Sequence, residues 1–261
     1  MSLQISHDEL AKWLAERRYL SDSCHDADFD GSLGKVVDGV LTPEQEVDLL
    51  RYTRTQPPGS TIYKDGYRSF VGACPVGDTI LAHKYYHRLS VRRQLGYSMF
   101  GSRAMKAWIA SRVFTKLGVE TPRPIAIFEY RRFGLLTDSC LFVTEVAEGV
   151  PFMDYLEAHS EDEVKMDVVA ASCKEIFDRL AAYRIYHRDT ATKNFIVNDE
   201  GVVSVFDLDA VRILVPPMFW GAKRAKDKYR FMRSFRRFPH LEDKFAKVFD
   251  ATGEKAGFEL D

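Results

Sequence analysis

The stretch Tyr186–Asn194 reads YHRDTATKN and places an acid, Asp189, five residues before an amide, Asn194. The next residues, FIVNDEGVVSVFDLD, are two apolar runs joined by Asn198–Gly201, which is a typical signal of a β-hairpin. Because the two ends of an antiparallel hairpin lie together, we expect a second acid, Asp207, to return to the position of Asn194. The sequence therefore predicts that two acids and one amide converge on one site.

Two acids and an amide in this order are typical of phosphoryl transfer. Asn194 and Asp207 offer hard oxygen ligands, which Mg2+ accepts when the phosphates of a nucleotide supply further ligands. Asp189 then stays free to accept the proton of a hydroxyl group and to orient that group. Each motif by itself is also compatible with an ordinary turn or strand end, so the prediction depends on their occurring together.

A lysine in a strand completes the arrangement of a protein kinase. Lys84 lies in TILAHKYY, the third of three predicted strands, and is expected to neutralise the phosphates of ATP. Adenine is expected beside the backbone of Glu145 and Val146, where the last predicted strand leads towards the next helix. The catalytic loop has no lysine two residues after Asp189, and Lys193 is the candidate for contact with the transferred phosphoryl group.

The predicted elements fall into three zones, which together predict a bilobal α+β fold of the protein-kinase type. Residues 1–57 carry two helix-start signals and are expected to form a helical N-terminal extension. Residues 58–147 show five strands around one long helix that begins after Ser102, and we expect an N-lobe with a five-stranded antiparallel sheet. Residues 148–261 are expected to form a mainly helical C-lobe.

The composition is that of an ordinary globular protein, with 46% hydrophobic and 29% charged residues among 261. A formal net charge of −1 gives no general attraction to nucleic acid, and we expect no nucleic-acid partner. The four scattered cysteines fit reduced thiols in a cytosolic compartment better than disulfides or zinc. The first residues lack the apolar core of a signal peptide, and the longest apolar run, Ile213–Trp220, is far shorter than the roughly 20 residues of a membrane span.

Six motifs make the chain similar to a known family. They are KYYHR, SRAMKAWIASRVFTKLGVETPRPIAIFEYRR, GLLTDSCLFVTEVAEG, YHRDTATKNFIV, FDLDAVR and KYRFMRSFRR, within roughly residues 60–240. In these motifs the chain resembles the lipopolysaccharide-core kinases of Gram-negative bacteria, the Kdo and heptose kinases with their InaA-like relatives. The resemblance implies ATP-dependent phosphorylation of a heptose or Kdo hydroxyl in the inner core, by a peripheral enzyme at the cytoplasmic face of the inner membrane.

Two runs of basic residues agree with a phosphorylated glycolipid as acceptor and with contact to an anionic membrane surface. The first run has no carboxylate from Lys84 to Val119, and the second basic run extends from Lys223 to Arg237. A solvated protein face would show the same pattern. The segment after Asp209 contains no Ala-Pro-Glu motif, which argues against a peptide substrate. The sequence does not identify any protein partner.

Two departures from the kinase pattern leave alternatives open. Ala107 stands where the family resemblance places the helix glutamate that pairs with the strand lysine, and the nucleotide loop lacks GxGxxG. Lys84 then needs another carboxylate, for which Asp207 is a candidate, while Asp209 is compatible with metal binding, acceptor binding or capping. The alternatives to a sugar kinase are a kinase for protein serine or threonine and a pseudokinase that acts as a binding or scaffold module.

Overall fold

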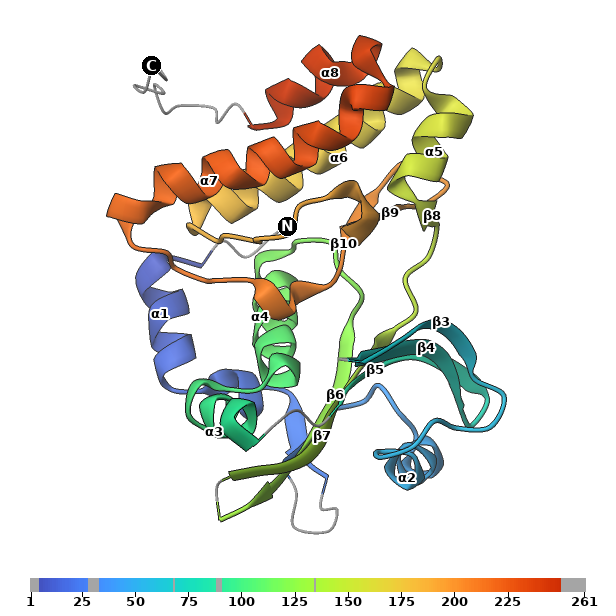
Figure 1. Cartoon of the computed structure of the whole chain (residues 1–261), viewed down its shortest axis with the longest axis vertical. Coiled ribbons are helices and arrows are strands. Elements are labelled where there is room, and N and C mark those ends of the chain that lie inside the picture. The colour runs from blue at the N-terminus through green and yellow to red at the C-terminus, as the bar shows by residue number, and fades with distance from the viewer. Residues whose placement is uncertain (1–4, 28–32, 68, 88–90, 134, 250–261) are drawn as a thin grey trace. The chain divides into compact units, whose positions relative to one another are not determined.

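The computed structural model describes residues 5–27, 33–67, 69–87, 91–133 and 135–249 (Figure 1). The chain divides into two compact units. The first consists of Met1–Ala147 with Phe206–Val211, and the second consists of Glu148–Val205 with Arg212–Asp261. The short segment Phe206–Val211 thus belongs to the first unit, although the strand directly before it belongs to the second.

A seven-stranded antiparallel sheet runs through the first unit, in the order β1-β2-β6-β7-β5-β4-β3. Its strands are β1 (Cys24–Asp26), β2 (Leu33–Val37), β3 (Thr61–Gly66), β4 (Ser69–Val76), β5 (Thr79–Tyr86), β6 (Pro124–Arg132) and β7 (Leu135–Glu145). The sequence predicts only β3 to β7, so β1 and β2 correct both the five-stranded sheet and the purely helical residues 1–57. Both strands are short, and β2 is placed by pairing with the distant β6, a contact that local propensity does not reveal.

Among the described residues of this unit, four helices and two 3-10 turns accompany the sheet. They are α1 (His7–Ala15), α2 (Pro43–Arg51), α3 (Val91–Phe100), α4 (Arg103–Leu117), η1 (Arg18–Leu20) and η3 (Leu208–Ala210). The two helix-start signals predicted in residues 1–57 are Ser6 with Glu9 and Thr42 with Gln45, and they form the capping boxes of α1 and α2. The sequence predicts a start at Ser102 and an end at Gly118 for α4, and both are confirmed, since the Ser102 side chain accepts from the amide of Met105 and Gly118 ends the helix with a φ of 68°. The sequence does not predict α3.

The two faces of the sheet have different neighbours. Leu141 of β7 and Leu49 of α2 belong to one buried apolar cluster on the first face. Tyr85 of β5 belongs to the same cluster. Because successive side chains of a strand alternate between faces, Lys84 and Tyr86 lie on the opposite face. That face contacts α4.

The N-terminal segment around η1 is attached to α4. The indole nitrogen of Trp108 donates a hydrogen bond of 2.8 Å to the carbonyl of Tyr19, and Arg112 donates to the carbonyl of Asp22. The buried Trp108 also contacts Phe142 of β7 edge-on, with 6.5 Å between ring centroids. These contacts hold α4 between the sheet and the N-terminal segment.

The second unit is mainly helical. Its elements are α5 (Phe152–His159), α6 (Glu163–Ala182), α7 (Pro217–Met232) and α8 (Pro239–Ala246), the 3-10 turns η2 (Thr192–Asn194), η4 (Arg233–Arg237) and η5 (Lys247–Phe249), and the strands β8 (Val150–Pro151), β9 (Phe195–Val197) and β10 (Val203–Val205). In Figure 1, α7 runs along α6, and the rings of Phe177 and Phe231 join them at 5.1 Å. The combination of an antiparallel sheet with a helical second unit confirms the predicted α+β class.

Two local predictions for this unit have different outcomes. The hairpin is confirmed, since Phe195 pairs with Val205 and the turn lies at Asn198–Gly201. Ser160 with Glu163 predicts the start of α6 from the sequence, but this prediction is wrong, because Asp162 caps the helix while Ser160 lies at the end of α5. None of the helices in the described part of the chain is long and apolar enough to span a bilayer.

Candidate active site

The middle of β5 supplies the first candidate side chain. Lys84 lies opposite Val71 of β4 and Phe142 of β7, so strands on both sides fix its backbone. Its ammonium group forms an ion pair with Oδ1 of Asp207 and lies 3.3 Å from Oδ2 of Asp209. The structure thus brings Lys84 and Asp207 together, and it adds Asp209, whose role the sequence left open.

The two acids lie on one short turn but differ in exposure. Asp207 precedes η3 with a φ of 61° and a ψ of 52°, in the left-handed region that aspartate tolerates better than most residues. Leu208 between the two acids is buried. The side chain of Asp207 is 36% exposed, whereas that of Asp209 is 8% exposed. Asp207 is therefore accessible to a ligand, while Asp209 is occupied by protein contacts.

A cation from α4, which the sequence does not predict for the site, completes this group. Nη2 of Arg103 lies 2.7 Å from Oδ2 of Asp209, the oxygen that also faces Lys84. The ring of Tyr86 lies 5.2 Å from Nζ of Lys84 and 5.0 Å from Cζ of Arg103. Burial, and next the charge of Asp209, raise the pKa of Tyr86 well above its usual value, so its hydroxyl stays neutral. Ala107 follows Arg103 by one helical turn and is buried.

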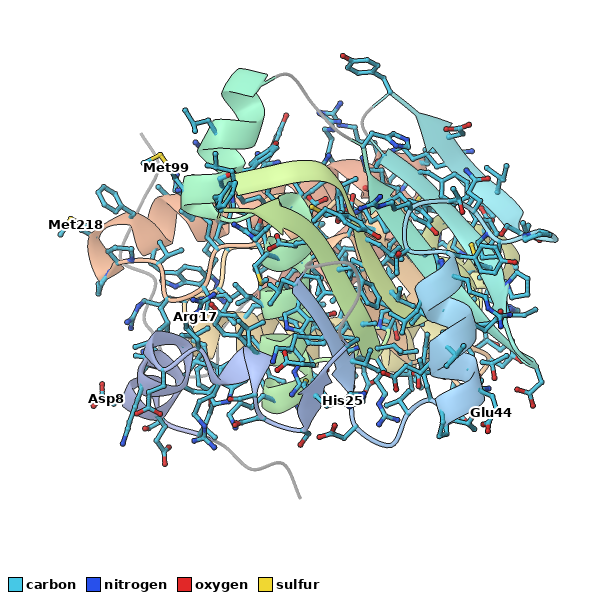
Figure 2. The ribbon with its side chains drawn as sticks, turned by 90° about the horizontal axis from the view of Figure 1, so that it is seen from below. Asp8, Arg17, His25, Glu44, Met99 and Met218 are labelled. Atoms are coloured by element: carbon cyan, nitrogen blue, oxygen red, sulfur yellow. The ribbon has the colours of Figure 1, made fainter. Side chains whose placement is uncertain are left out.

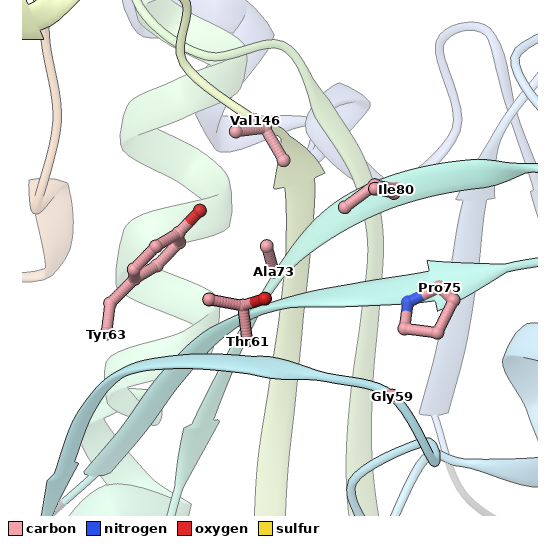
Figure 3. Close-up of a pocket in the computed structure, with 7 residues that line it drawn as sticks. All are labelled: Gly59, Thr61, Tyr63, Ala73, Pro75, Ile80 and Val146. Atoms are coloured by element: carbon pink, nitrogen blue, oxygen red, sulfur yellow. The ribbon is translucent and has the colours of Figure 1, made fainter.

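A hollow of about 320 Å³ lies over β3, β4 and β5 (Figure 3). It is lined by Gly59, Thr61, Tyr63, Ala73, Pro75, Ile80 and Val146. This mostly apolar lining suits the flat ring of a nucleobase. Of the two residues predicted beside adenine, Val146 lines the hollow. The backbone N–H of Glu145 already donates to the carbonyl of Arg123 at 3.0 Å.

In the second unit, the loop before β9 carries the predicted catalytic residues. Nζ of Lys193 lies 3.3 Å from Oδ2 of Asp189. Nδ2 of the buried Asn194 donates a hydrogen bond of 2.8 Å to the backbone carbonyl of Asp189. The Asp189 side chain is 37% exposed, so its carboxylate is open to a substrate. Asp189 thus contacts both of the other residues predicted for this loop.

The loop is attached to α7 through an acid, Asp227, which is not among the residues predicted for the site. Asp227 is 4% exposed, and its carboxylate accepts hydrogen bonds from the backbone amides of His187, at 2.9 Å, and Arg188, at 3.1 Å. Arg188 has a φ of 75°, an unfavourable conformation for arginine that this hydrogen bond helps to hold. Thr190 Oγ1 donates to the backbone carbonyl of Asp227 at 2.7 Å. One signal was available, because Asp227 is the only acid within the second basic run.

Burial changes the acidity of Asp227. It raises the pKa of the carboxyl group to about 7, although the amides of His187 and Arg188 and the charge of Arg230 favour the ionised form. Nη1 of Arg230 lies 3.8 Å from this carboxylate and donates to the hydroxyl of Tyr186 at 3.0 Å. The ring of His187 is itself buried, which fits a packing role and no contact with substrate.

Each unit contains an oxygen donor that suits Mg2+. Nδ2 of Asn194 is used by the carbonyl of Asp189, which leaves its Oδ1 for a cation. Asp207 offers a partly exposed carboxylate. Over the described ranges of the chain, no three His, Cys, Asp or Glu side chains form a metal cluster. Amide and carboxylate oxygens suit a hard cation that also binds phosphate or water, and they do not suit zinc.

Comparisons with known proteins concern the family and the fold of the chain. The profile of the family described as "Lipopolysaccharide kinase (Kdo/WaaP) family" matches residues 76–249, more than half of the chain. A solved structure described as "WaaP in complex with acyl carrier protein" is similar with a TM-score of 0.50 and 17% identity, over 73% of this chain and 78% of that chain. At this identity the likeness concerns the fold, and it confirms the predicted kinase-like fold. No curated protein matched the chain.

Proposed function

Because the chain belongs to the lipopolysaccharide kinase (Kdo/WaaP) family, whose members phosphorylate a sugar hydroxyl, we propose that it transfers the γ-phosphoryl group of ATP to a heptose or Kdo of the lipopolysaccharide inner core. The observation that carries this proposal is the ion pair between Lys84 and Asp207. A strand lysine and the acid that follows the catalytic hairpin are the charged residues that a kinase uses at the phosphates and at the metal. The apolar hollow beside Val146 supports ATP as the donor.

The proposed roles follow from the chemistry of each side chain. Asp189 accepts the proton of the sugar hydroxyl and orients its oxygen towards the γ-phosphorus. Lys193, next to Asp189, stabilises the charge of the transferred phosphoryl group. Lys84 binds the nucleotide phosphates, and Asn194 and Asp207 hold Mg2+. When bound, Mg2+ neutralises the phosphate oxygens and the leaving group.

The division of the chain supports two kinase lobes. The first unit changes to the second between Ala147 and Glu148, which fits an N-lobe at 58–147 and a C-lobe at 148–261. Phe206–Val211 returns to the first unit and carries Asp207 to Lys84. We propose residues 1–57 as an extension of the N-lobe, because β1 and β2 add to the same sheet.

We propose that α7 faces an anionic membrane surface, at the cytoplasmic side of the inner membrane. Its first turn exposes Met218 by 81% and Phe219 by 54%, and Met218 stands out from the ribbon in Figure 2. Five cations of the second basic run, from Lys223 to Arg230, follow on the same helix, and its last three arginines lie in η4. Apolar side chains beside cations are typical of a helix that lies among lipid head groups. The first basic run is the weaker candidate, because its cations Lys84 and Arg103 are only 16% and 29% exposed, whereas Arg230 and Arg237 of the second run are 38% and 71% exposed.

One observation favours a second candidate function. Ala107 leaves α4 without a carboxylate for Lys84 at that position, as in a pseudokinase that binds nucleotide without turnover. The ion pairs of Lys84 with Asp207 and Asp209 speak against this candidate, since the lysine still has acidic partners. A kinase for protein serine or threonine is the other alternative, and no feature of the described residues favours it.

A phosphotransfer assay tests these candidates. The purified chain receives Mg2+, γ-labelled ATP and either dephosphorylated lipopolysaccharide core or a generic protein. We expect label on the glycolipid, and a loss of about 10²- to 10⁴-fold in rate for Asp189→Asn. This variant should fold, because Asn194 contacts the backbone carbonyl of Asp189. The control is Asp178→Asn, an acid 35% exposed that pairs with Lys174 on α6. Label on protein alone would support the protein kinase, and nucleotide binding without label would support the pseudokinase.

A further inference from the structure

We infer that Asp209, held by Arg103, is the positioning carboxylate of Lys84 and replaces the glutamate that α4 lacks at Ala107. This inference rests on the proposed ATP site and concerns how Lys84 keeps its place when Mg2+ and nucleotide bind. All four residues lie in the first unit, on β5, α4 and η3.

The strand lysine of a kinase needs an acidic partner, because an ammonium group on a flexible stem otherwise occupies many positions. In the kinase template this partner is a glutamate of the helix, which links the helix to the strand. In this chain α4 presents the cation Arg103 one turn before Ala107, and the acid comes from η3. The helix therefore contributes a cation where the kinase template has an acid. Asp209 lies between this cation, Arg103, and Lys84, and so links α4 to β5.

The geometry of Asp209 fits this linking role. Its Oδ2 lies 2.7 Å from Nη2 of Arg103 and 3.3 Å from Nζ of Lys84, so one oxygen joins α4 to β5. The side chain of Asp209 is 8% exposed and that of Lys84 is 16% exposed, so water screens their attraction only weakly. The ring of Tyr86 lies near both cations. Removing Asp209 would leave two neighbouring cations at a partly buried site.

Asp207 does not serve equally well as a permanent partner. Its carboxylate is 36% exposed and is the proposed metal ligand, so a bound cation competes with Lys84 for it. Asp209 is neutralised on its other side by Arg103 and is less accessible. Within the described residues, Asp209 is then the remaining carboxylate at ion-pair distance from Lys84. Asp209 should therefore matter most when Mg2+ is present.

Binding of β,γ-imido-ATP to the full chain, in Mg2+ and in EDTA, tests this difference. We expect Asp209→Asn to weaken binding about 10- to 100-fold in Mg2+, but less than about threefold in EDTA, where Asp207 still holds Lys84. Arg103→Met should weaken binding in the same direction, because Asp209 loses its second partner. The matched control is Arg179→Met, since Arg179 is 23% exposed, against 29% for Arg103, and pairs with Glu175 on α6.

Moving the carboxylate to α4 separates positioning from a general structural role. Position 107 lies one turn from Arg103 on the same face of α4, so Asp209→Asn combined with Ala107→Glu should recover most of the Mg2+-dependent affinity and of kcat. Thermal unfolding of each variant identifies losses that come from stability alone. A folded double variant without recovery would show that Asp209 acts otherwise, for example as a metal ligand, and would overturn the inference.

Two further outcomes are also decisive. An effect of Asp209→Asn that is equal in Mg2+ and EDTA would overturn the inference. If Asp209→Asn or the double variant does not fold, Arg103→Met is the deciding variant. If Arg103→Met binds the analogue in Mg2+ as tightly as the wild type, Arg103 does not hold Asp209 in place and the inference is overturned. If the wild-type chain binds the analogue but phosphorylates neither acceptor, the binding comparison can still be made. Failure of the proposed sugar acceptor is therefore distinguishable from failure of the role inferred for Asp209. A wild-type chain that does not bind the analogue would overturn the ATP site and this inference together.

Discussion

The side-chain amide of Asn194 donates a hydrogen bond of 2.8 Å to the backbone carbonyl of Asp189. Because Asn194 is 4% exposed, this bond fixes its orientation and leaves Oδ1 available for a cation. We expect Asn194→Ala to raise the Mg2+ concentration needed for half-maximal activity by about 10- to 100-fold. Titration of phosphotransfer with Mg2+ at saturating ATP measures this change.

A second asparagine in the same hairpin supplies the control. Asn198 accepts from the backbone amides of Glu200 and Val202 at its side-chain oxygen, at 3.1 Å and 2.8 Å, and lies in the turn between β9 and β10. Asn198→Ala should cost about 1 kcal/mol of stability and leave the Mg2+ requirement unchanged. If both variants show the same Mg2+ dependence as the wild type, Asn194 is not a metal ligand.

The raised pKa of Asp227 makes the stability of the chain depend on pH. Burial raises the pKa of its carboxyl group from 3.8 to about 7. Between these values the folded state holds a proton that the unfolded state has released, so the stability contribution of this group falls as pH rises from about 4 to about 7. Above that window it no longer changes. Asp227→Asn removes the titration and should therefore remove this slope.

Urea unfolding of the wild type and Asp227→Asn at several pH values between 5 and 8 measures the difference, with all other titrating groups in common. The free energy of unfolding of the variant should also be lower by about 1–3 kcal/mol at every pH in this range, because an amide side chain has one acceptor oxygen for the two backbone amides of His187 and Arg188. A difference that stays constant with pH would show that Asp227 is ionised in the folded chain at all these values.

The sequence predicted the loop residues from local patterns, and it offered the pair of Lys84 with Asp207, 123 residues apart, only through the kinase template. Asp189 and Asn194 share one loop, and the hairpin after them has a strong turn signal, so local patterns were sufficient. The ion pair of Arg103 with Asp209 spans 106 residues, and the hydrogen bond of His187 to Asp227 spans 40. These contacts depend on how α4 and α7 pack, which one sequence without the fold does not show. For the same reason the sequence did not predict β2, whose partner strand β6 lies far along the chain.

The exposed start of α7 leads to a prediction about membrane binding. We expect the chain to sediment with vesicles of phosphatidylglycerol and to stay in solution with vesicles of phosphatidylcholine. Met218→Asp with Phe219→Asp should weaken the first interaction at least about tenfold, because it removes the exposed apolar pair and adds negative charge. The control is Val164→Asp, since Val164 is a similarly exposed apolar residue, at 74%, at the start of α6. Equal loss in both variants would indicate that α7 is not the binding element.

The hollow over β3 to β5 yields a prediction about the adenine ring. Ala73 lines it from β4, so Ala73→Leu places additional methyl groups in the space proposed for the base. We expect KM for ATP to rise about tenfold or more, while kcat at saturating ATP changes little, because the residues around the phosphates are untouched. Steady-state kinetics with varied ATP separates the two parameters. Inhibition by inorganic tripolyphosphate, which has no base, should be the same in variant and wild type.

Ala126→Leu is the control, because Ala126 is fully buried in β6 of the same sheet and belongs to its apolar cluster. This change overpacks the core and should cost about 1–3 kcal/mol of stability. The folded fraction should keep the wild-type KM for ATP, since Ala126 does not line the hollow. A rise in KM for both variants, or weaker inhibition by tripolyphosphate in Ala73→Leu, would mean that Ala73→Leu acts by distorting the sheet. In that case adenine would bind elsewhere, and the proposed contact of Val146 with adenine would be wrong.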